Sequence, residues 1–161
     1  MTIRPHLPTP ATPDAPAYGH GSHPGRDGRL VALAVIIPCF NEREALAQLF
    51  ERLHGAEAAF PQHIRVHWCF VDDGSSDGTW DALCAHDEGR PNCTVVRHEK
   101  NQGLTAAILT GVAHTDAPLI GSIDADCTYD PAELPAMLRR MNADVAVVTA
   151  SPYHPQGSVD G

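Results

Sequence analysis

Short apolar runs alternate along the chain with segments whose apolar side chains recur every three or four positions. A run bounded by polar or turn-forming residues predicts a buried strand, and the longer spacing predicts a helix with one buried face. The pattern predicts strands at residues 30–38, 64–71, 94–97, 118–123 and 145–149. It predicts helices around Leu46–Leu53, from Thr79, around Leu104–Val112 and around Leu134–Met141. Strands that alternate with helices in this way are typical of an α/β fold with right-handed βαβ units and a mostly parallel sheet.

Two of the predicted helices begin with residues that commonly cap helices. Asn41, with Glu44 three residues later, predicts a capping box at the start of the first helix. Asp130, Pro131 and Glu133 supply an N-cap, a first-turn proline and a carboxylate in the first turn of the last helix.

The first 28 residues do not follow the alternating pattern. Prolines interrupt them repeatedly, at Pro5, Pro8, Pro10, Pro13, Pro16 and Pro24. Few apolar side chains are available there to offset the entropy lost on ordering, so we expect residues 1–28 to form a disordered tail. The remainder, residues 29–161, is long enough for one domain.

Composition excludes several classes of protein. The formal net charge of −9 argues against a nucleic-acid scaffold, which needs a basic face. No apolar run approaches the roughly 20 residues of a membrane-spanning helix. The 5 cysteines include no CxxC pair, which argues against a structural zinc site or a disulfide framework and favours a cytoplasmic location.

Acidic and polar residues directly follow three of the predicted strands. Glu42 lies just beyond the first strand, Asp72 and Asp73 follow the second, and Asp124 and Asp126 follow the fourth. If the strands are ordered 3-2-1-4 in the sheet, these three ends lie side by side at its carboxyl edge, where α/β sheets bind ligands. Each residue alone could be a helix cap or a turn residue. Together they form a concentration of carboxylates that is costly unless cations or hydrogen-bond donors face them.

The nucleotide-binding loops with glycine-rich signatures are absent. The sequence has no GxGxxG after its first strand and no GxxxxGK[ST]. A divalent metal held by Asp126, with Asp124, is an alternative way to bind phosphate. Carboxylate oxygens suit Mg²⁺ or Mn²⁺, which bridge the oxygens of a diphosphate.

Four segments, in this order, resemble the motifs of family-2 glycosyltransferases. They are VIIPCFNE at residues 35–42, VDDGSSDGT at 71–79, KNQGLTAA at 100–107 and DAD at 124–126. The likeness spans about residues 31–150. Within the family it is greatest to the branch of dolichol-phosphate mannosyltransferases and polyprenyl-phosphate glycosyltransferases.

The resemblance implies a Rossmann-like GT-A domain that binds a nucleotide-diphosphate sugar. Pro38, Phe40 and Glu42 would line the base and ribose pocket. Asp72 would accept a hydrogen bond from the base, with Asp73 holding the adjacent turn. The remaining implied contacts are Lys100, Asp124 and Ala125 with the nucleotide, and Asp124 and Asp126 with Mg²⁺ or Mn²⁺.

The expected function is therefore inverting transfer of a sugar from a nucleotide-diphosphate donor to a polyprenyl phosphate or glycan acceptor. Relatives of this kind continue well beyond the length of this chain, so we expect a fragment whose catalytic base lies beyond Gly161. The sequence assigns no base, and His154 reads as a loop residue. The parent protein is expected at the cytoplasmic face of a membrane.

Two alternatives remain open at this stage. Residues 124–128 also match the DxDxT motif of haloacid-dehalogenase-type phosphatases, with Asp124 as nucleophile and Asp126 as acid or base. However, no lysine follows Thr128, although that family needs one. The second alternative is a catalytically inactive fragment that still binds a nucleotide sugar.

Overall fold

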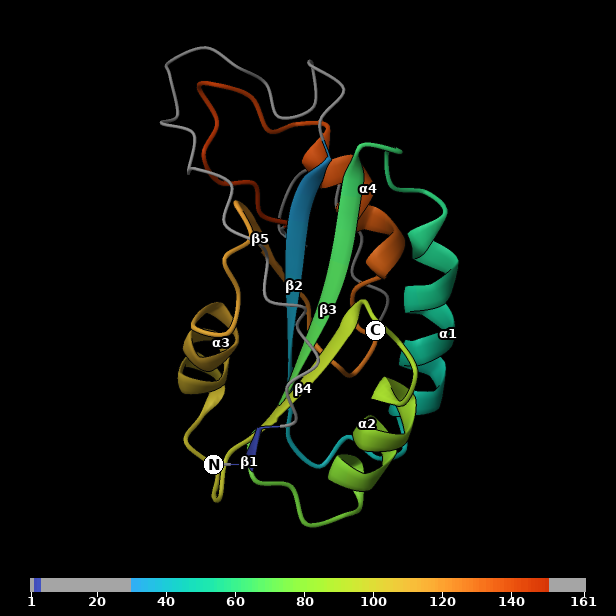
Figure 1. Ribbon diagram of the computed structural model, residues 1–161, viewed down its shortest axis with the longest axis vertical. Helices are drawn as coiled ribbons and strands as arrows, with labels where there is room; N and C mark the ends of the chain where they lie inside the picture. The colour runs from blue at the N-terminus through green and yellow to red at the C-terminus, as the bar shows by residue number, and fades with distance from the viewer. Residues whose placement is uncertain (1, 4–29, 151–161) are drawn as a thin grey trace.

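The computed structural model describes Thr2–Ile3 and residues 30–150. A sheet of five strands, in the order β1-β4-β3-β2-β5, runs through the middle of the molecule (Figure 1). Its strands are β1 (Thr2–Ile3), β2 (Val31–Cys39), β3 (Ile64–Asp72), β4 (Cys93–Arg97) and β5 (Leu119–Ser122). β2, β3, β4 and β5 are mutually parallel, and β1 pairs antiparallel with β4. The predicted α/β class and the predicted order of four parallel strands are confirmed.

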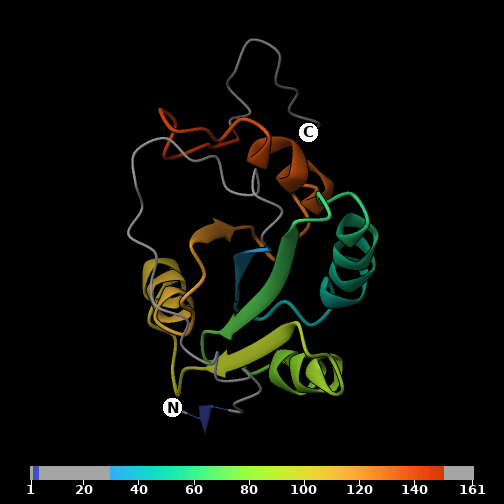
Figure 2. The ribbon, with the colours of Figure 1, turned by 45° about the horizontal axis from the view of Figure 1, so that its top comes forward.

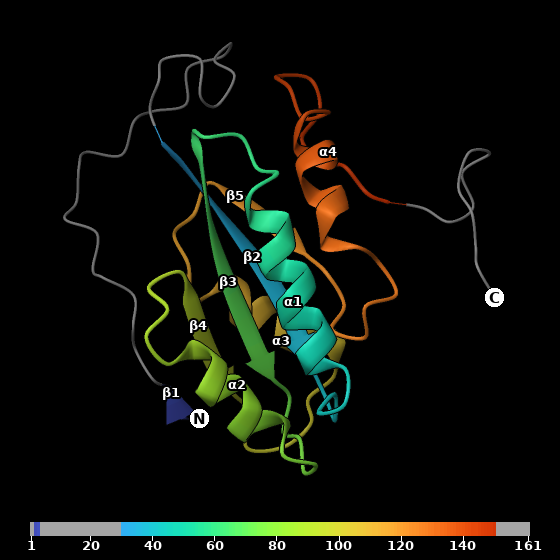
Figure 3. The ribbon, with the colours of Figure 1, turned by 90° about the vertical axis from the view of Figure 1, so that its right-hand side faces the viewer.

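Helices cover both faces of this sheet. α1 (Leu46–Glu57) and α2 (Thr79–Asp87) lie across the sheet from α3 (Leu104–Val112), as Figure 2 shows. A 3₁₀ turn, η1 (Pro131–Glu133), leads into the short helix α4 (Leu134–Leu138). η1 packs beside α1, and Figure 3 shows α4 on the same side of the sheet as α1 and α2. Among the described residues, no helix is long and apolar enough to cross a membrane.

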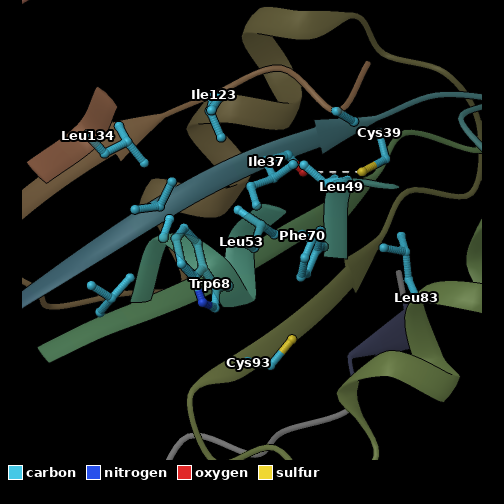
Figure 4. Close-up of a cluster of buried hydrophobic side chains, with 14 of the residues drawn as sticks. Ile37, Cys39, Leu49, Leu53, Trp68, Phe70, Leu83, Cys93, Ile123 and Leu134 are labelled. Atoms are coloured by element: carbon cyan, nitrogen blue, oxygen red, sulfur yellow. Dashed lines mark hydrogen bonds between the residues drawn. The ribbon is translucent and has the colours of Figure 1, made fainter. Parts of the chain in front are cut away.

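The central strand β2 is buried on both faces, which explains its continuous apolar sequence. Alternate side chains point to opposite faces of a strand. Val35 and Ile37 therefore face the larger core with Leu49 of α1, which Figure 4 shows in part. Ile36 faces the smaller core with Ala107 of α3.

The parallel register brings strand ends to a common edge. Cys39, the last residue of β2, pairs with Asp72, the last residue of β3. Asp72 pairs in turn with Arg97 at the end of β4. The loops that follow these strands therefore leave the sheet side by side, as the sequence predicted.

Three details of the prediction need correction or lie outside the described residues. The strand expected at 145–149 is wrong: Val145 forms only an isolated bridge with Asn142, and Val147 is 75% exposed. β5 pairs only with β2 in the described part of the chain, so this apolar run has no strand beside it to share backbone hydrogen bonds. Thr2–Ile3, placed in the predicted tail, forms β1. The rest of that tail, residues 1 and 4–28, lies outside the described residues.

The last predicted helix is shorter than expected, but its start is confirmed. Asp130 Oδ1 accepts a hydrogen bond from the Ala132 amide at 2.9 Å, and Pro131 is the first residue of η1. α4 then ends at Leu138 rather than near Met141.

Candidate functional site

A cavity of about 280 Å³ lies at the carboxyl edge of the parallel strands. Its lining includes most of the residues expected to bind a nucleotide or metal, namely Pro38, Phe40, Glu42, Asp73, Asp124, Ala125 and Asp126. It also includes Cys39, Asn101, Gly103, Leu104 and Ala107, which the residue-by-residue prediction did not assign. The motif at 100–107 pointed to this segment, but Lys100 is exposed and is not part of the lining.

The loop after β2 is held by hydrogen bonds to the loop after β3. Ser75 Oγ accepts from the Asn41 amide, and Asn41 Oδ1 accepts from the Ser76 amide, both at 2.9 Å. Thr79 Oγ1 accepts from the Glu42 amide at the same distance. Asn41 has a φ of 57°, a left-handed conformation that asparagine tolerates. These contacts place Glu42 at the cavity.

The capping box predicted for Asn41 and Glu44 is therefore wrong. α1 begins later, after Ala45, and has no side-chain cap. The Asn41 side chain faces Ser76 on the neighbouring loop, because the parallel strands bring that loop alongside. A local pattern of polar residues could not show whether the Asn41 side chain would bond to its own helix or to Ser76 on the neighbouring loop.

Asp72, which the resemblance implied as a contact to the base, is completely buried and does not line the cavity. Its Oδ1 accepts from the Ser75 amide at 3.2 Å. Arg97 Nε forms an ion pair with Oδ2 at 3.0 Å, although its N–H does not point at that oxygen well enough to make a hydrogen bond. The Arg97 guanidinium also lies over the Trp80 ring, 5.2 Å from its centroid. The carboxylate therefore fixes the end of β3 and neutralises Arg97.

Asp73 lines the cavity and binds the loop before α3. Its Oδ1 accepts from the Gln102 amide at 2.8 Å, and its Oδ2 accepts from the Gly103 amide at 2.7 Å. Its Oδ1 also lies 2.6 Å from His98 Nδ1. The side chain is only 4% exposed, so its charge is balanced by these donors rather than by water. Asp73 therefore holds the loop before α3. The turn after β3, which the sequence analysis expected Asp73 to hold, is bonded instead by Asp72 through the Ser75 amide.

Gly74 allows these two loops to approach closely, and we expect Gly74→Ala to lower the free energy of unfolding by about 2–4 kcal/mol. Its φ is 76°, and an added Cβ would lie 2.6 Å from the carbonyl carbon of Lys100. Gly89 is the matched control, because its φ is 78° but an added Cβ would meet nothing within 4 Å. Gly89→Ala should cost only the backbone term, about 1 kcal/mol. Urea denaturation of both variants would measure the difference, and equal losses would contradict the close approach.

The segment after β5 presents two carboxylates to the cavity. Ala125 is buried in the core, and the flanking Asp124 and Asp126 are exposed. Asp126 Oδ1 accepts from the Thr128 amide at 2.9 Å, which closes a tight turn. Cys127, inside that turn, has a φ of 63°, and its carbonyl accepts from Arg52 Nη1 of α1 at 3.0 Å. The two carboxylates are thus carried on a turn that α1 holds in place.

The wall of the cavity is acidic, and its charges affect one another. Burial raises the pKa of Glu42 above its usual value, and the carboxylates of Asp126, Asp77 and Asp124 raise it further. Negative charges that disfavour each other in this way would be stabilised by a bound cation. Mg²⁺ is commonly held by one or two carboxylates, with water and substrate phosphates as the other ligands. Asp124 and Asp126 fit that donor set. No cluster of three or more His, Cys, Asp or Glu side chains within the described residues could hold a metal by itself.

A second cavity, of about 420 Å³, lies beside β5 and α4. Its lining is mainly apolar, including Leu33, Leu134 and Met137, and it shares only Asp124 with the first cavity. The larger cavity also has carboxylates, from Asp124, Asp130 and Glu133, but Asp126 and the loops after β2 and before α3 line only the smaller one.

Solved structures with a similar fold are glycosyltransferases of the GT-A class. One is S. aureus TarS, residues 1–349, with a TM-score of 0.51 and 23% identity over 60% of this chain and 28% of that chain. Another is the mannosyltransferase PcManGT from Pyrobaculum calidifontis in complex with GDP-Man and Mn²⁺, with a TM-score of 0.50 and 24% identity over 58% of this chain and 27% of that one. These likenesses show that the chain has a GT-A fold.

The model of glycosyl transferase family 2 matches residues 34–161, so the chain belongs to that family. The dolichol-phosphate mannosyltransferase of Pyrococcus furiosus is 30% identical over 80% of this chain and 35% of its own length. The undecaprenyl-phosphate 4-deoxy-4-formamido-L-arabinose transferase of Serratia proteamaculans is 34% identical over 66% of this chain and 32% of its own length. The chain spans about a third of the length of these curated relatives. The predicted family is confirmed, and membership in it leaves no support for the phosphatase interpretation of residues 124–128.

Proposed function

We propose that this chain binds the nucleoside diphosphate of a sugar donor and serves inverting transfer of the sugar to a polyprenyl phosphate or glycan. The supporting observation is the single cavity that Phe40 and Glu42 share with Asp124 and Asp126, in a chain of glycosyl transferase family 2. One wall has the residue types that bind a base and ribose, and the other has those that bind a metal and diphosphate.

In this proposal the nucleoside lies against the β2 end of the cavity. Phe40, which is 46% exposed, offers an aromatic surface to the base beside Pro38. The Glu42 carboxylate accepts hydrogen bonds from the ribose hydroxyls. Asp72 is buried and does not line the cavity, so a direct contact with the base would require its carboxylate to move. Lys100 is exposed at the start of the adjoining loop and could approach the phosphates.

The diphosphate lies, in this proposal, toward Asp124 and Asp126. These two carboxylates would hold Mg²⁺ or Mn²⁺, and the bound metal would supply Lewis-acid stabilisation of the departing diphosphate. Ala125, between these two residues, anchors the segment in the core. Arg52 keeps the turn after Asp126 in place through the Cys127 carbonyl.

We propose the acceptor class from the names of two relatives, which include the terms dolichol-phosphate and undecaprenyl-phosphate. A phosphate oxygen reaches the site already ionised, and it can attack the anomeric carbon without a strong general base. A sugar hydroxyl would need such a base, and we assign none within the described residues. Acceptors of the polyprenyl type would place the protein at the cytoplasmic face of a membrane.

Calorimetric titration of the full chain tests the proposed donor site. In the presence of Mn²⁺, either UDP or GDP should bind clearly more tightly than its own monophosphate, UMP or GMP. The comparison within one base isolates the contribution of the second phosphate. Equal affinity for each diphosphate and its monophosphate, or no binding of any of the four, would contradict the proposal. Donor binding without sugar transfer to any acceptor would instead support the inactive nucleotide-sugar-binding alternative.

A further inference from the structure

His98 is a buried histidine just beyond β4 that no motif in the sequence singled out. Its ring is 3% exposed and bridges two elements. Nδ1 lies 2.6 Å from Asp73 Oδ1, and Nε2 lies 2.8 Å from Thr110 Oγ1 of α3. Its own backbone amide donates to the Asp72 carbonyl at 2.8 Å. The ring is therefore fixed at both nitrogens and at its backbone.

The partners of His98 determine which nitrogen carries a proton. A carboxylate can only accept hydrogen bonds, so the nitrogen that faces Asp73 must be the donor. Nδ1 is therefore protonated, and Thr110, whose hydroxyl can donate or accept, completes the bond at Nε2. In this arrangement the imidazole orients the Asp73 carboxylate.

The orientation of Asp73 sets the position of one wall of the cavity. The same carboxylate accepts the amides of Gln102 and Gly103, and Gly103 both lines the cavity and precedes α3. Gly103 has a φ of 92°, a conformation that favours glycine, at the point where the loop enters α3. A rotation of the carboxylate would release both amides together.

We propose that His98 is a positioning residue for the donor site: it holds Asp73 in the one orientation that secures the wall formed by Asn101, Gly103 and Leu104. The connection from Thr110 through His98 and Asp73 to the amides of residues 102 and 103 is continuous and buried or half-buried. The expected contribution of His98 to ligand affinity rests on the proposed function. Its expected contribution to the order of the two amides does not.

Two substitutions at His98 separate positioning from simple space filling. In His98→Asn, the side-chain amide lies close to the place of Nδ1 and can still donate to Asp73. In His98→Gln, it lies close to the place of Nε2 and can reach Thr110 but not Asp73. If His98 acts through Asp73, the Asn variant should recover most of the wild-type behaviour and the Gln variant should not. If His98 served packing alone, the Gln variant should recover more of the wild-type behaviour than the Asn variant, because glutamine is closer to histidine in volume.

Hydrogen exchange of the Gln102 and Gly103 amides is the primary measurement. We expect both amides to exchange at least about tenfold faster in His98→Gln than in wild type, and less than about threefold faster in His98→Asn. Equal exchange in the two variants, or faster exchange in His98→Asn, would overturn the proposal. Thr110→Val gives a second route should His98→Gln not fold, because it removes only the partner of Nε2. It should speed exchange of the same two amides, and unchanged exchange there would also overturn the proposal.

Affinity for UDP and GDP with Mn²⁺, measured on the same proteins, links the network to the site. The diphosphate that wild type binds should lose about tenfold or more in affinity in His98→Gln and recover in His98→Asn. If wild type binds neither diphosphate, the proposed function fails while the exchange result still decides the role of His98. If exchange changes as expected but affinity does not, His98 positions the loop without serving the donor site, which overturns that part of the proposal.

Discussion

Asp73→Asn is expected to lower the free energy of unfolding by about 3–5 kcal/mol, the largest loss of stability we predict for a single substitution. The wild-type carboxylate accepts from two backbone amides and faces the His98 ring, all in a setting almost closed to water. An asparagine has one acceptor oxygen, and its NH₂ group would face a donor. At least one buried N–H would then be left without a partner.

Asp130→Asn is the matched control for this prediction. It makes the same chemical change at an exposed helix start, where Asp130 accepts one amide and asparagine caps equally well. Guanidinium denaturation at neutral pH should show a large loss for Asp73→Asn and little change for Asp130→Asn. Similar small changes in both proteins would mean that the Asp73 network contributes little to the fold.

Asp126→Asn is expected to have the largest effect on the metal-dependent part of binding. It removes one negative charge from the proposed metal site, and we expect most of the gain in diphosphate affinity that Mn²⁺ produces to disappear, about tenfold or more. The local structure should survive, because the asparagine oxygen can still accept the Thr128 amide that Asp126 Oδ1 accepts now. Phe40 and Glu42 are unchanged, so binding of the nucleoside portion should persist.

Glu44→Gln controls for charge alone. Glu44 is exposed and lies two residues beyond Glu42, but it is not part of the lining. Its removal makes the same change in net charge. Only a carboxylate that binds the metal should abolish the metal-dependent gain, and an equal loss in both variants would point to a general field effect.

The sheet could be predicted because each of its central strands carries its own signal. The run from Val31 to Cys39 is apolar on both faces because helices bury both faces. The common edge of the acidic residues then followed from the parallel strand order. The run at 145–149 has a similar composition but no strand beside it in the described part of the chain, and composition alone does not show whether a partner exists.

The site could be predicted as a set of residue types but not as a set of contacts. Asp73, Asp124 and Asp126 were expected at the cavity and line it. Asn41 was expected to cap its own helix, yet it bonds to a residue 35 positions away. His98 carries no local signal, because its partners lie 25 and 12 residues away along the chain. Contacts of this kind depend on which loops the sheet places together.

Titration of wild type and Asp126→Asn with UDP and GDP, each with and without Mn²⁺, tests the central claim most directly. The account predicts that Mn²⁺ tightens the binding of a diphosphate to wild type, improves the matching monophosphate much less, and has little effect on Asp126→Asn. If Mn²⁺ makes no difference to the affinity of wild type for either diphosphate, Asp124 and Asp126 do not form a metal site for the donor. The proposed metal-dependent donor site would then be contradicted.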